Sequence, residues 1–332
     1  MPFEIKRVIV FGAGALGSLL GGKLSRVVPV ILVGREAHMA EIRASGLRLG
    51  GLSNAHAACG DLFSAVSRLD EGFAFRADDA VLLTVKAQDV GAALASLGRV
   101  PPGLRVPLFA LQNGTGFEDA LRAGERQGFQ PLHVVAHLGA TLRGPGEVED
   151  WGGELLLPAG EASEALAARL QRAGIGARIV ENLEAARWKK IVFNCALNAL
   201  AAILEVPNNE TLADAWRPLR RAVLDEGRSL AASHGVELPP AENLLLEFER
   251  RASMSRNVNS MWQDLLRGRP TEIEYLNGAV VQQAGSRQVP ANERLAVWIR
   301  VLERATLPDV RRAALEAARE DLRAFVAAEA RA

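Results

Sequence analysis

The sequence predicts an α/β fold class, in which an N-terminal domain with a doubly wound parallel sheet precedes a C-terminal all-helical domain. The chain has 332 residues, and at about 150 residues per domain this length corresponds to two domains. In the first half, apolar β-branched runs alternate with helical patterns, as they do in α/β proteins. After about residue 181 only helical patterns follow. We therefore expect one domain over residues 1–180 and a second over residues 181–332.

The elements of the first domain follow one another in βαβ order. Continuous apolar runs, which are typical of buried parallel strands, predict strands at residues 5–11, 28–33, 80–85, 106–111 and 177–180. Helical periodicity predicts helices at residues 14–26, 36–45, 90–97 and 161–173. Between residues 133 and 157, short apolar runs separated by glycine-containing turns predict hairpin strands that close the sheet.

The second domain is predicted to consist of helices divided by prolines. Pro207, the Pro239-Pro240 pair, Pro270 and Pro290 interrupt the periodic pattern, and proline ends a helix because it lacks a backbone N–H group. The predicted helices cover residues 183–204, 211–234, 241–250, 259–267, 272–284, 292–302 and 309–328.

The charge balance and the rare residue types exclude several classes of protein. Lysine and arginine together number 39, and aspartate and glutamate also number 39, so the chain lacks the electropositive field that binding to a nucleic-acid backbone needs. Cys59, Cys195 and the five histidines show no metal-ligand spacing. We expect no nucleic-acid partner, no metal and a reducing, cytoplasmic setting.

The apolar runs are too short for a membrane span. The longest cover residues 8–22 and 191–204, fewer than the roughly 20 residues that cross a bilayer. Glu4 within the basic start, and Gly-Gly-Lys at residues 21–23, argue against a signal peptide. We expect no membrane association.

A glycine-rich turn predicts a dinucleotide-binding site. Residues 12–17 read Gly-Ala-Gly-Ala-Leu-Gly, a GxGxxG pattern that follows a predicted strand and opens a predicted helix. The first glycine allows the tight turn, the second lets a pyrophosphate approach the backbone, and the third packs the helix against the strand. The N–H groups and the positive dipole end of the helix face the phosphates.

The end of the second strand favours NADP(H) over NAD(H). An NAD site has Asp or Glu at this point for the ribose hydroxyls, whereas this chain has Arg35, which suits a 2′-phosphate. Glu36 argues the other way, although an acidic residue is also favoured in the first turn of the following helix.

Lysine is rare in this chain, and one lysine lies in a polar stripe on an apolar helix. Only five of the 39 basic residues are lysines, and lysine, unlike arginine, can lose its proton in a protein. Lys190, Asn194 and Asn198 are spaced i, i+4 and i+8, so they share one helix face. Inside an apolar helix, such groups need a polar cleft, a ligand or an internal network.

A second polar cluster covers residues 257–264 and 267–274. Ser260 or Asn259 can cap the helix that follows, and Thr271 can cap the next helix. Glu272 and Glu274 are favoured in a first helical turn by the helix dipole. Capping does not explain residues 261–264, so this cluster is a weaker functional candidate.

Several motifs along the chain form one recognisable set. They are residues 12–17, the segment from Arg35 to Leu49, Thr84-Val85-Lys86-Ala87, Leu111-Gln112-Asn113-Gly114, Gly144-Pro145-Gly146, residues 188–198, Ser260-Met261, Gln263-Asp264 and Thr271-Glu272. Together these motifs resemble the ketopantoate reductase family, also called 2-dehydropantoate 2-reductase, over nearly the whole chain. The resemblance implies NADPH-dependent reduction of ketopantoate to (R)-pantoate in pantothenate biosynthesis, with Lys190 as the proton donor to the C2 carbonyl oxygen.

The resemblance also implies roles for individual residues. The implied substrate contacts are Asn113, Asn194, Asn198, Asn208 and Ser260, with Ser260 at the substrate carboxylate. The implied cofactor contacts are Gly12, Ala13, Gly14, Ala15, Leu16, Gly17, Arg35, Lys86, Asn113, Ala140 and Glu272. A carbonyl that becomes an alkoxide needs an acid beside its oxygen, and we expect burial near other cations to bring the pKa of Lys190 into a useful range.

Two alternatives stay open at this point. One is a reductase of the same fold that acts on another 2-keto acid, and the other is a non-catalytic NADP(H) sensor, since Rossmann folds carry many functions. The helical tail beyond Glu303 departs from familiar members of the family. We expect a small-molecule 2-keto acid as the substrate, and a homodimer through the helical domain as the candidate assembly.

Overall fold

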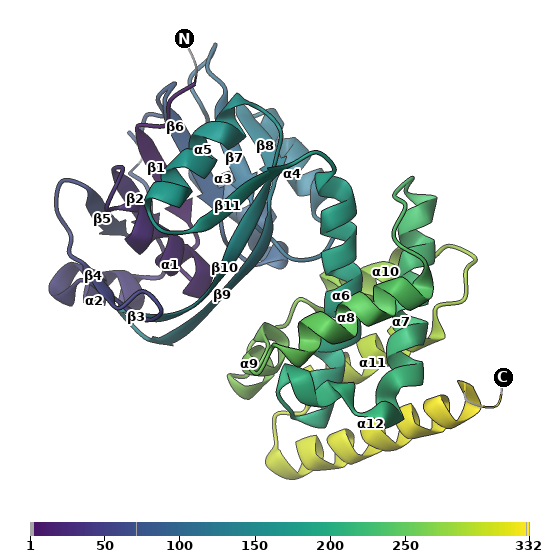
Figure 1. Ribbon diagram of the computed structural model, residues 1–332. Helices are drawn as coiled ribbons and strands as arrows, with labels where there is room; N and C mark the ends of the chain where they lie inside the picture. The colour runs from purple at the N-terminus through teal and green to yellow at the C-terminus, as the bar shows by residue number, and fades with distance from the viewer. Residues whose placement is uncertain (1–2, 71, 330, 332) are drawn as a thin grey trace. The chain divides into compact units, whose positions relative to one another are not determined.

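In the computed structural model the chain divides into two units (Figure 1). The structure describes residues 3–70, 72–329 and 331. The first unit comprises Met1–Gln112 and Phe117–Leu183, and the second comprises Asn113–Gly116 and Glu184–Ala332. The short segment Asn113–Gly116 therefore makes its contacts with the helical unit, although it lies within the α/β half of the sequence.

A parallel sheet with the strand order β5-β2-β1-β6-β7-β8 forms the first layer of the first unit. This is the doubly wound order of dinucleotide-binding folds, which reverses direction between the first and fourth strands, here β1 and β6. The predicted Rossmann-type fold class is confirmed. The strand bounds are β1 (Arg7–Phe11), β2 (Val30–Val33), β5 (Phe63–Val66), β6 (Asp79–Leu83), β7 (Val106–Ala110) and β8 (Phe129–His133).

The strands β1, β6 and β7 are apolar on both faces because both faces are covered. All five residues of β6 and β7 are buried, as expected of central parallel strands. Asp79 starts β6 and is fully buried, and it accepts hydrogen bonds from Arg7 Nε and Nη2 at 2.8 and 2.7 Å. The helices of this unit are α1 (Ala15–Leu24), α2 (Glu36–Ser45), the 3₁₀ helix η1 (Ala87–Asp89), α3 (Val90–Leu97), α4 (Glu118–Glu125) and α5 (Glu161–Arg172).

The hairpin predicted between residues 133 and 157 is present, but it belongs to a second sheet and does not close the first. Its strand β10 pairs along one edge with β9 and along the other with β3 and then β11. The position beside β7 is taken by β8. Helix α1 packs against β9, β10 and β3, so it lies between the two sheets. The strands of this second sheet are β3 (Leu47–Gly51), β4 (Ala55–Ala57), β9 (Val135–Gly144), β10 (Glu147–Pro158) and β11 (Gly176–Val180).

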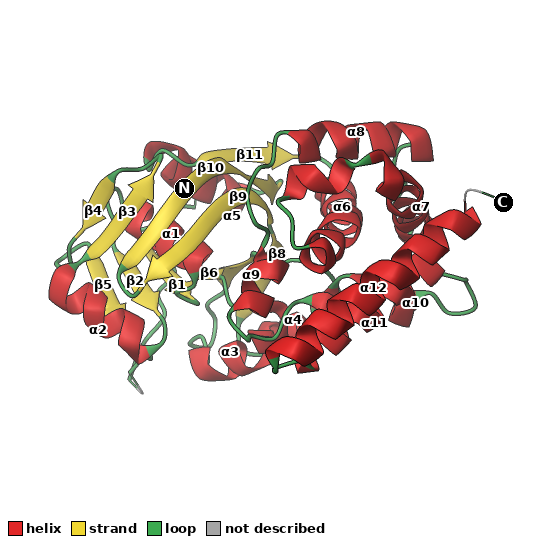
Figure 2. Ribbon diagram, turned by 90° about the horizontal axis from the view of Figure 1, so that it is seen from below, coloured by secondary structure: helices red, strands yellow, loops and turns green. Residues whose placement is uncertain are grey.

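The second unit is helical, as the sequence predicts, with a single apolar core. Two predicted helices are interrupted. Residues 211–216 form short 3₁₀ turns ahead of α7, and the helix expected over residues 272–284 breaks at Leu276, whose ψ of −108° is not helical. Figure 2 shows the long α12 across this unit, where it contacts α7 and α11. The elements are α6 (Leu183–Leu204), η2 (Asn208–Leu212), η3 (Asp214–Trp216), α7 (Arg217–Ser233), α8 (Ala241–Ser253), α9 (Ser260–Leu266), η4 (Ile273–Tyr275), α10 (Asn277–Gln283), α11 (Pro290–Arg304) and α12 (Pro308–Glu329).

Candidate active site

The glycine-rich turn connects β1 to α1 and is built from close backbone contacts. Gly12 has φ +117°, and a Cβ there would lie 2.5 Å from the backbone nitrogen of Val85. A Cβ on Gly17 would lie 2.2 Å from the carbonyl oxygen of Gly12. Both positions therefore require glycine, for conformation at the first and for packing at the second.

The N-terminus of α1 has the properties of a dinucleotide cradle. A Cβ on Gly14, the N-cap, would meet no atom within 4 Å, so this side of the turn is open to a ligand. No side chain caps the helix, and its first turn contains no acidic residue. Ala15 and Leu16 pack against the core behind the turn. Uncapped N–H groups at the positive end of a helix dipole fit the pyrophosphate of a dinucleotide.

The adjacent ends of β2 and β5 carry the charged residues next to this turn. Val33 pairs with Val66, so the segments that begin at Gly34 and Ser67 leave the sheet side by side. Arg35 and Arg68 are exposed, and within the described part of the chain neither has a carboxylate partner. Glu36 instead accepts hydrogen bonds from Ser67 and Arg43, which hold its pKa below the usual range.

Two further predicted cofactor residues lie elsewhere in the first unit. Lys86 follows β6 and precedes η1, and because Phe11 pairs with Leu83 it leaves the same sheet end as the glycine-rich turn. Gln112 fixes this sheet end, since its Nε2 donates to the carbonyls of Leu83 and Val85 at 2.8 and 3.0 Å. Ala140 lies in the middle of β9 opposite Asp150, in the second sheet.

In the second unit, α6 carries the polar stripe over the residues that the sequence predicts. The helix is Leu183–Leu204, and its apolar positions from Trp188 to Ile203 are buried in the helical core. Lys190 and Asn194 are half-buried and Asn198 is 6% exposed. Among the residues described, no hydrogen bond engages the side-chain amides of Asn194 and Asn198. Two amide groups on one helix face are thus available to a ligand.

Lys190 belongs to a chain of three hydrogen-bonded side chains from distant parts of the sequence. Its Nζ donates to Oδ1 of Asn113 at 2.6 Å, and Nδ2 of Asn113 donates to Oε2 of Glu272 at 3.2 Å. This fixes the orientation of the Asn113 amide, because an ammonium group only donates and a carboxylate only accepts. The contact between Lys190 and Asn113 explains how this buried amine is held.

Burial lowers the pKa of Lys190 to about 8, while the negative charge of Glu272 opposes the fall. The sequence-based expectation was a fall caused by burial near other cations. Burial is the cause, and the neighbouring charge that acts on Lys190 is an anion. An amine with this pKa can hold a proton near neutral pH and release it to an alkoxide oxygen.

Asn208 and Asn259 form a buried network beside the stripe. Asn208 donates to Oγ of Ser255 at 3.0 Å and accepts from Nδ2 of Asn259 at 3.0 Å. Asn259 also donates to the backbone carbonyl of Asn198 at 3.4 Å and caps α9 by accepting from the Trp262 N–H group. Asn259 is therefore the cap of α9, and the exposed Ser260 is its first helical residue.

The scarcity of lysine is only a partial guide to the site. Lys189 donates to both carboxylate oxygens of Glu247 at 3.0 and 3.1 Å and so joins α6 to α8. Lys23 donates to the buried Asp150 at 3.0 Å and joins α1 to β10. Lys189 and Lys23 thus join elements of the fold, whereas Lys190 donates to the polar side chain of Asn113.

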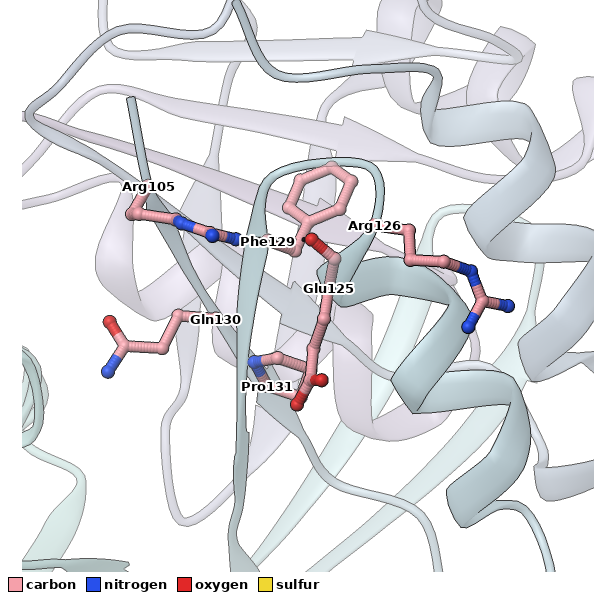
Figure 3. A pocket seen from close by; sticks show the side chains of 6 residues that line it. All are labelled: Arg105, Glu125, Arg126, Phe129, Gln130 and Pro131. Atoms are coloured by element: carbon pink, nitrogen blue, oxygen red, sulfur yellow. Dashed lines mark hydrogen bonds between the residues drawn. The ribbon is translucent and has the colours of Figure 1, made fainter. Parts of the chain in front are cut away.

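The first unit also has an open hollow of about 670 Å³ (Figure 3). Arg105 Nη1 donates to the backbone carbonyl of Glu125 at its rim, at 3.1 Å. None of the predicted site residues lines it. The lining residues are Arg105, Glu125, Arg126, Phe129, Gln130 and Pro131.

The described part of the chain contains neither a metal-binding cluster nor a helix suited to a membrane. In the described ranges, no three His, Cys, Asp or Glu side chains are grouped as they would be around a metal ion. No helix among those residues combines the length and the apolar character that crossing a bilayer requires.

Comparison with known proteins identifies the class that this fold and site define, a family of Rossmann-fold oxidoreductases. The family model described as ketopantoate reductase PanE/ApbA matches residues 8–156, and the model of its C-terminal part matches residues 182–303. The 2-dehydropantoate 2-reductase of Pyrococcus horikoshii is 31% identical over 312 residues, which cover 91% of this chain and 98% of the relative. The chain belongs to the ketopantoate reductase family. Helix α12 lies beyond the matched residues.

Solved structures agree with this assignment. A PanE/ApbA family ketopantoate reductase from Ralstonia eutropha is 32% identical, with a TM-score of 0.77, and the match covers 90% of this chain and 98% of that chain. A D-mandelate dehydrogenase in complex with NADH and anilino(oxo)acetate is 24% identical, with a TM-score of 0.78 and the same coverage. This second likeness shows a shared fold.

Sequence reasoning missed several residues of these two regions. Ser67 and Arg68 follow β5, a strand that was not predicted because its four residues include a serine. Tyr275 contributes through its backbone carbonyl, which accepts the Thr115 N–H group at 2.9 Å. A backbone contact of this kind leaves no signal in residue type.

Proposed function

We propose that the protein reduces 2-dehydropantoate to (R)-pantoate with NADPH, in pantothenate biosynthesis, with Lys190 as the proton donor. The observation that carries this proposal is the hydrogen-bonded chain of Lys190, Asn113 and Glu272 next to the unoccupied amides of Asn194 and Asn198. Membership of the ketopantoate reductase family supports it.

The chemistry follows from the needs of a carbonyl that becomes an alcohol. Bound NADPH supplies a hydride to the C2 carbon. The C2 oxygen then carries developing negative charge. The positively charged amine of Lys190 stabilises this charge, and its Nζ donates a proton to the oxygen. Glu272 favours the charged form of Lys190, so Nζ holds the proton that the C2 oxygen needs.

The amides of α6 would orient the substrate. Asn194 and Asn198 lie one and two helical turns beyond Lys190 on the same face, so both can bind the hydroxyl end of the substrate while Nζ faces the C2 oxygen. We propose that the exposed hydroxyl of Ser260 binds the carboxylate. The Asn208 amide is engaged by Ser255 and Asn259, which favours a supporting role for it beneath this surface.

The preference for NADPH is proposed from the ends of β2 and β5. Arg35 and Arg68 offer two guanidinium groups to a 2′-phosphate, and arginine binds phosphate through paired charge-assisted hydrogen bonds. Glu36, which argued for NAD in the sequence, is bonded to Ser67 and Arg43. It is thereby less available to the ribose hydroxyls that an NAD site binds through an acidic residue.

A second candidate is the reduction of another 2-keto acid. It is favoured by the likeness in fold to the D-mandelate dehydrogenase, which binds NADH and anilino(oxo)acetate. The same fold therefore carries proteins with different 2-keto or 2-hydroxy acids, and side chains around the substrate decide between them.

The test is loss of NADPH absorbance with purified protein and ketopantoate, with pyruvate and 2-ketoisovalerate as comparison substrates and NADH as the alternative cofactor. We expect rapid, ketopantoate-selective oxidation of NADPH. Selective turnover of another keto acid would instead support the second candidate. Tight NADPH binding without turnover of any keto acid would overturn both and indicate a sensor.

A further inference from the structure

Asn113 begins a short segment that is bonded to the 3₁₀ helix η4 of the helical unit. Thr115 donates its N–H group to the carbonyl oxygen of Tyr275 at 2.9 Å. Gly114 has φ +88°, is buried, and lies so close to η4 that a Cβ there would be 2.0 Å from the same carbonyl oxygen. The approach of the segment to Tyr275 thus requires a residue without a side chain at position 114.

Charged residues of α11 hold the other side of this contact in place. Arg300 donates to both carboxylate oxygens of Glu274 at 2.6 and 2.7 Å. Glu303 accepts the backbone N–H group of Thr271 at 2.7 Å. The turn that carries Glu272 and Tyr275 is therefore fastened at both ends to one long helix. A fixed η4 gives the segment a firm support.

We propose that Gly114 is a positioning residue: its missing side chain lets the segment bond to Tyr275, and this bond holds the Asn113 amide between Nζ of Lys190 and the carboxylate of Glu272. The inference deepens the function proposed above, because it concerns the same proton donor. Among the residues described, the charged group that acts on Lys190 is Glu272, and Arg187 Nη2 donates to the carbonyl oxygen of Gly114 at 3.5 Å.

The consequence concerns the protonation of Lys190. The oxygen of Asn113 accepts a hydrogen bond from the ammonium form, so the contact favours the charged state of the amine. If residues 113–115 are pushed off Tyr275, the amide oxygen moves away from Nζ. Lys190 then loses its proton at lower pH, and a smaller share of the enzyme carries a loaded acid.

Gly116 provides a matched control for a substitution at Gly114. It also has a positive φ, of +99°, so alanine carries similar backbone strain at either position. A Cβ on Gly116 would find only a ring carbon of Tyr275, at 3.9 Å. Gly114→Ala therefore displaces the segment from the Tyr275 carbonyl, whereas Gly116→Ala leaves this contact intact.

The first readout is independent of turnover. Reductive methylation with ¹³C-formaldehyde labels the five lysines, and NMR follows the titration of each. The signal that is absent from the Lys190→Arg variant is assigned to Lys190. We expect Gly114→Ala to lower the pKa of Lys190, as Asn113→Leu does, and Gly116→Ala to leave it unchanged. The double variant Asn113→Leu/Gly114→Ala should lower the pKa of Lys190 no further than Asn113→Leu alone, because both substitutions remove the same contact between Asn113 and Lys190.

The second readout is the pH profile of kcat. We expect Gly114→Ala to lower kcat about tenfold and to move the fall at high pH to lower pH, with Gly116→Ala close to the wild type. Equal profiles for the two alanine variants would overturn the proposal. If the wild type does not reduce ketopantoate while the NMR shifts follow the expected order, the substrate assignment fails and the positioning role stands.

A measurement on the unmodified protein covers the case in which Gly114→Ala does not fold. The Thr115 amide hydrogen should exchange with deuterium much more slowly than the same amide in the unfolded chain, because it is bonded to the carbonyl oxygen of Tyr275. Exchange as fast as in the unfolded chain would show that the bond is not maintained and would overturn the proposal.

Discussion

The glycine-rich turn of the first unit and the Lys190 cluster of the second differ in the material from which they are built. The turn consists of backbone: Gly12, Gly14 and Gly17 matter through the atoms that they lack. The cluster consists of side chains, and Asn113, Lys190 and Glu272 come from positions 77 and 159 residues apart in the chain. The residues of a backbone site are neighbours in the sequence, whereas those of a side-chain site are brought together by tertiary packing.

This difference determines how each region responds to substitution. In the turn, an added methyl group meets backbone at Gly12 and Gly17 and open space at Gly14, so its effect is steric and appears in folding at the first two positions and in cofactor binding at the third. In the cluster, a substitution changes the protonation of Lys190, so the effect is on the proton transfer that this residue performs. Variants chosen in pairs should separate the two responses.

The largest effect should follow removal of the amine in the cluster. We expect Lys190→Ala to lower kcat/KM by about 10³-fold, because general acid catalysis contributes about 10² to 10⁴. Lys190→Arg should be almost as inactive, since arginine keeps its proton. Steady-state kinetics with NADPH and ketopantoate provides the measurement.

The adjacent lysine is the control for that variant. Lys189 is bonded to Glu247 at the surface of α8, so Lys189→Ala should keep kcat/KM within a few-fold and cost less than about 1 kcal/mol of stability. Similar losses for Lys189→Ala and Lys190→Ala would mean that the helix, and not the amine, is responsible.

The same contrast explains what the sequence could predict. Helix α6 spans the predicted residues 183–204 because its apolar pattern and its polar stripe both have helical period. The glycine-rich turn could be predicted because each of its glycines is required by the geometry of the turn itself or by the close approach of a pyrophosphate. The fold class followed from the alternation of patterns in the first half, which local hydrophobicity records directly.

What the sequence could not predict depends on long-range pairing. Strands β3, β4 and β5 are three to five residues long and contain polar residues, so their period is too short to detect. The sequence predicts the hairpin between residues 133 and 157, but not its sheet, because β10 pairs with β3 and β11, which lie outside the hairpin, and packs on α1. The link between Asn113 and Lys190 required the tertiary structure in the same way.

The next largest effects should appear in the turn, where two glycines give opposite outcomes. Gly14→Ala adds a methyl group that meets no protein atom, so the fold should be unaffected while NADPH binding weakens about tenfold to a hundredfold, as expected when one methyl group costs about 1–3 kcal/mol in a tight contact. Titration of protein fluorescence with NADPH and thermal unfolding are the two measurements.

Gly17→Ala should show the reverse order of effects. Its Cβ would lie 2.2 Å from the Gly12 carbonyl oxygen, so the turn itself must shift and the protein should lose about 2 kcal/mol or more of stability. Unchanged unfolding of Gly17→Ala, or a loss of stability in Gly14→Ala, would contradict the account of the turn.

A smaller effect is expected at the ends of β2 and β5. Arg35→Ala should raise the dissociation constant of NADPH about tenfold, because hydrogen bonds to charged groups contribute about 1.5–3 kcal/mol, and it should leave NADH binding nearly unchanged. Arg68→Ala should have a weaker effect of the same kind. Binding titrations with both cofactors would decide this, and equal losses for NADPH and NADH would remove the case for a 2′-phosphate site here.

The smallest expected change is a shift of the pH profile, and it tests the electrostatics of the cluster most directly. Lys190 acts as an acid only while protonated, so with a pKa of about 8 the wild-type kcat should fall as the pH rises through about 8. Glu272 stabilises the charged amine, and Glu272→Gln removes this charge but leaves the burial of Lys190 in place. The fall in kcat should therefore begin at lower pH in Glu272→Gln, with little change in activity at the acidic plateau. A profile that moved to higher pH would show that Glu272 acts on Lys190 other than through its charge, since loss of a neighbouring anion can only favour the neutral amine.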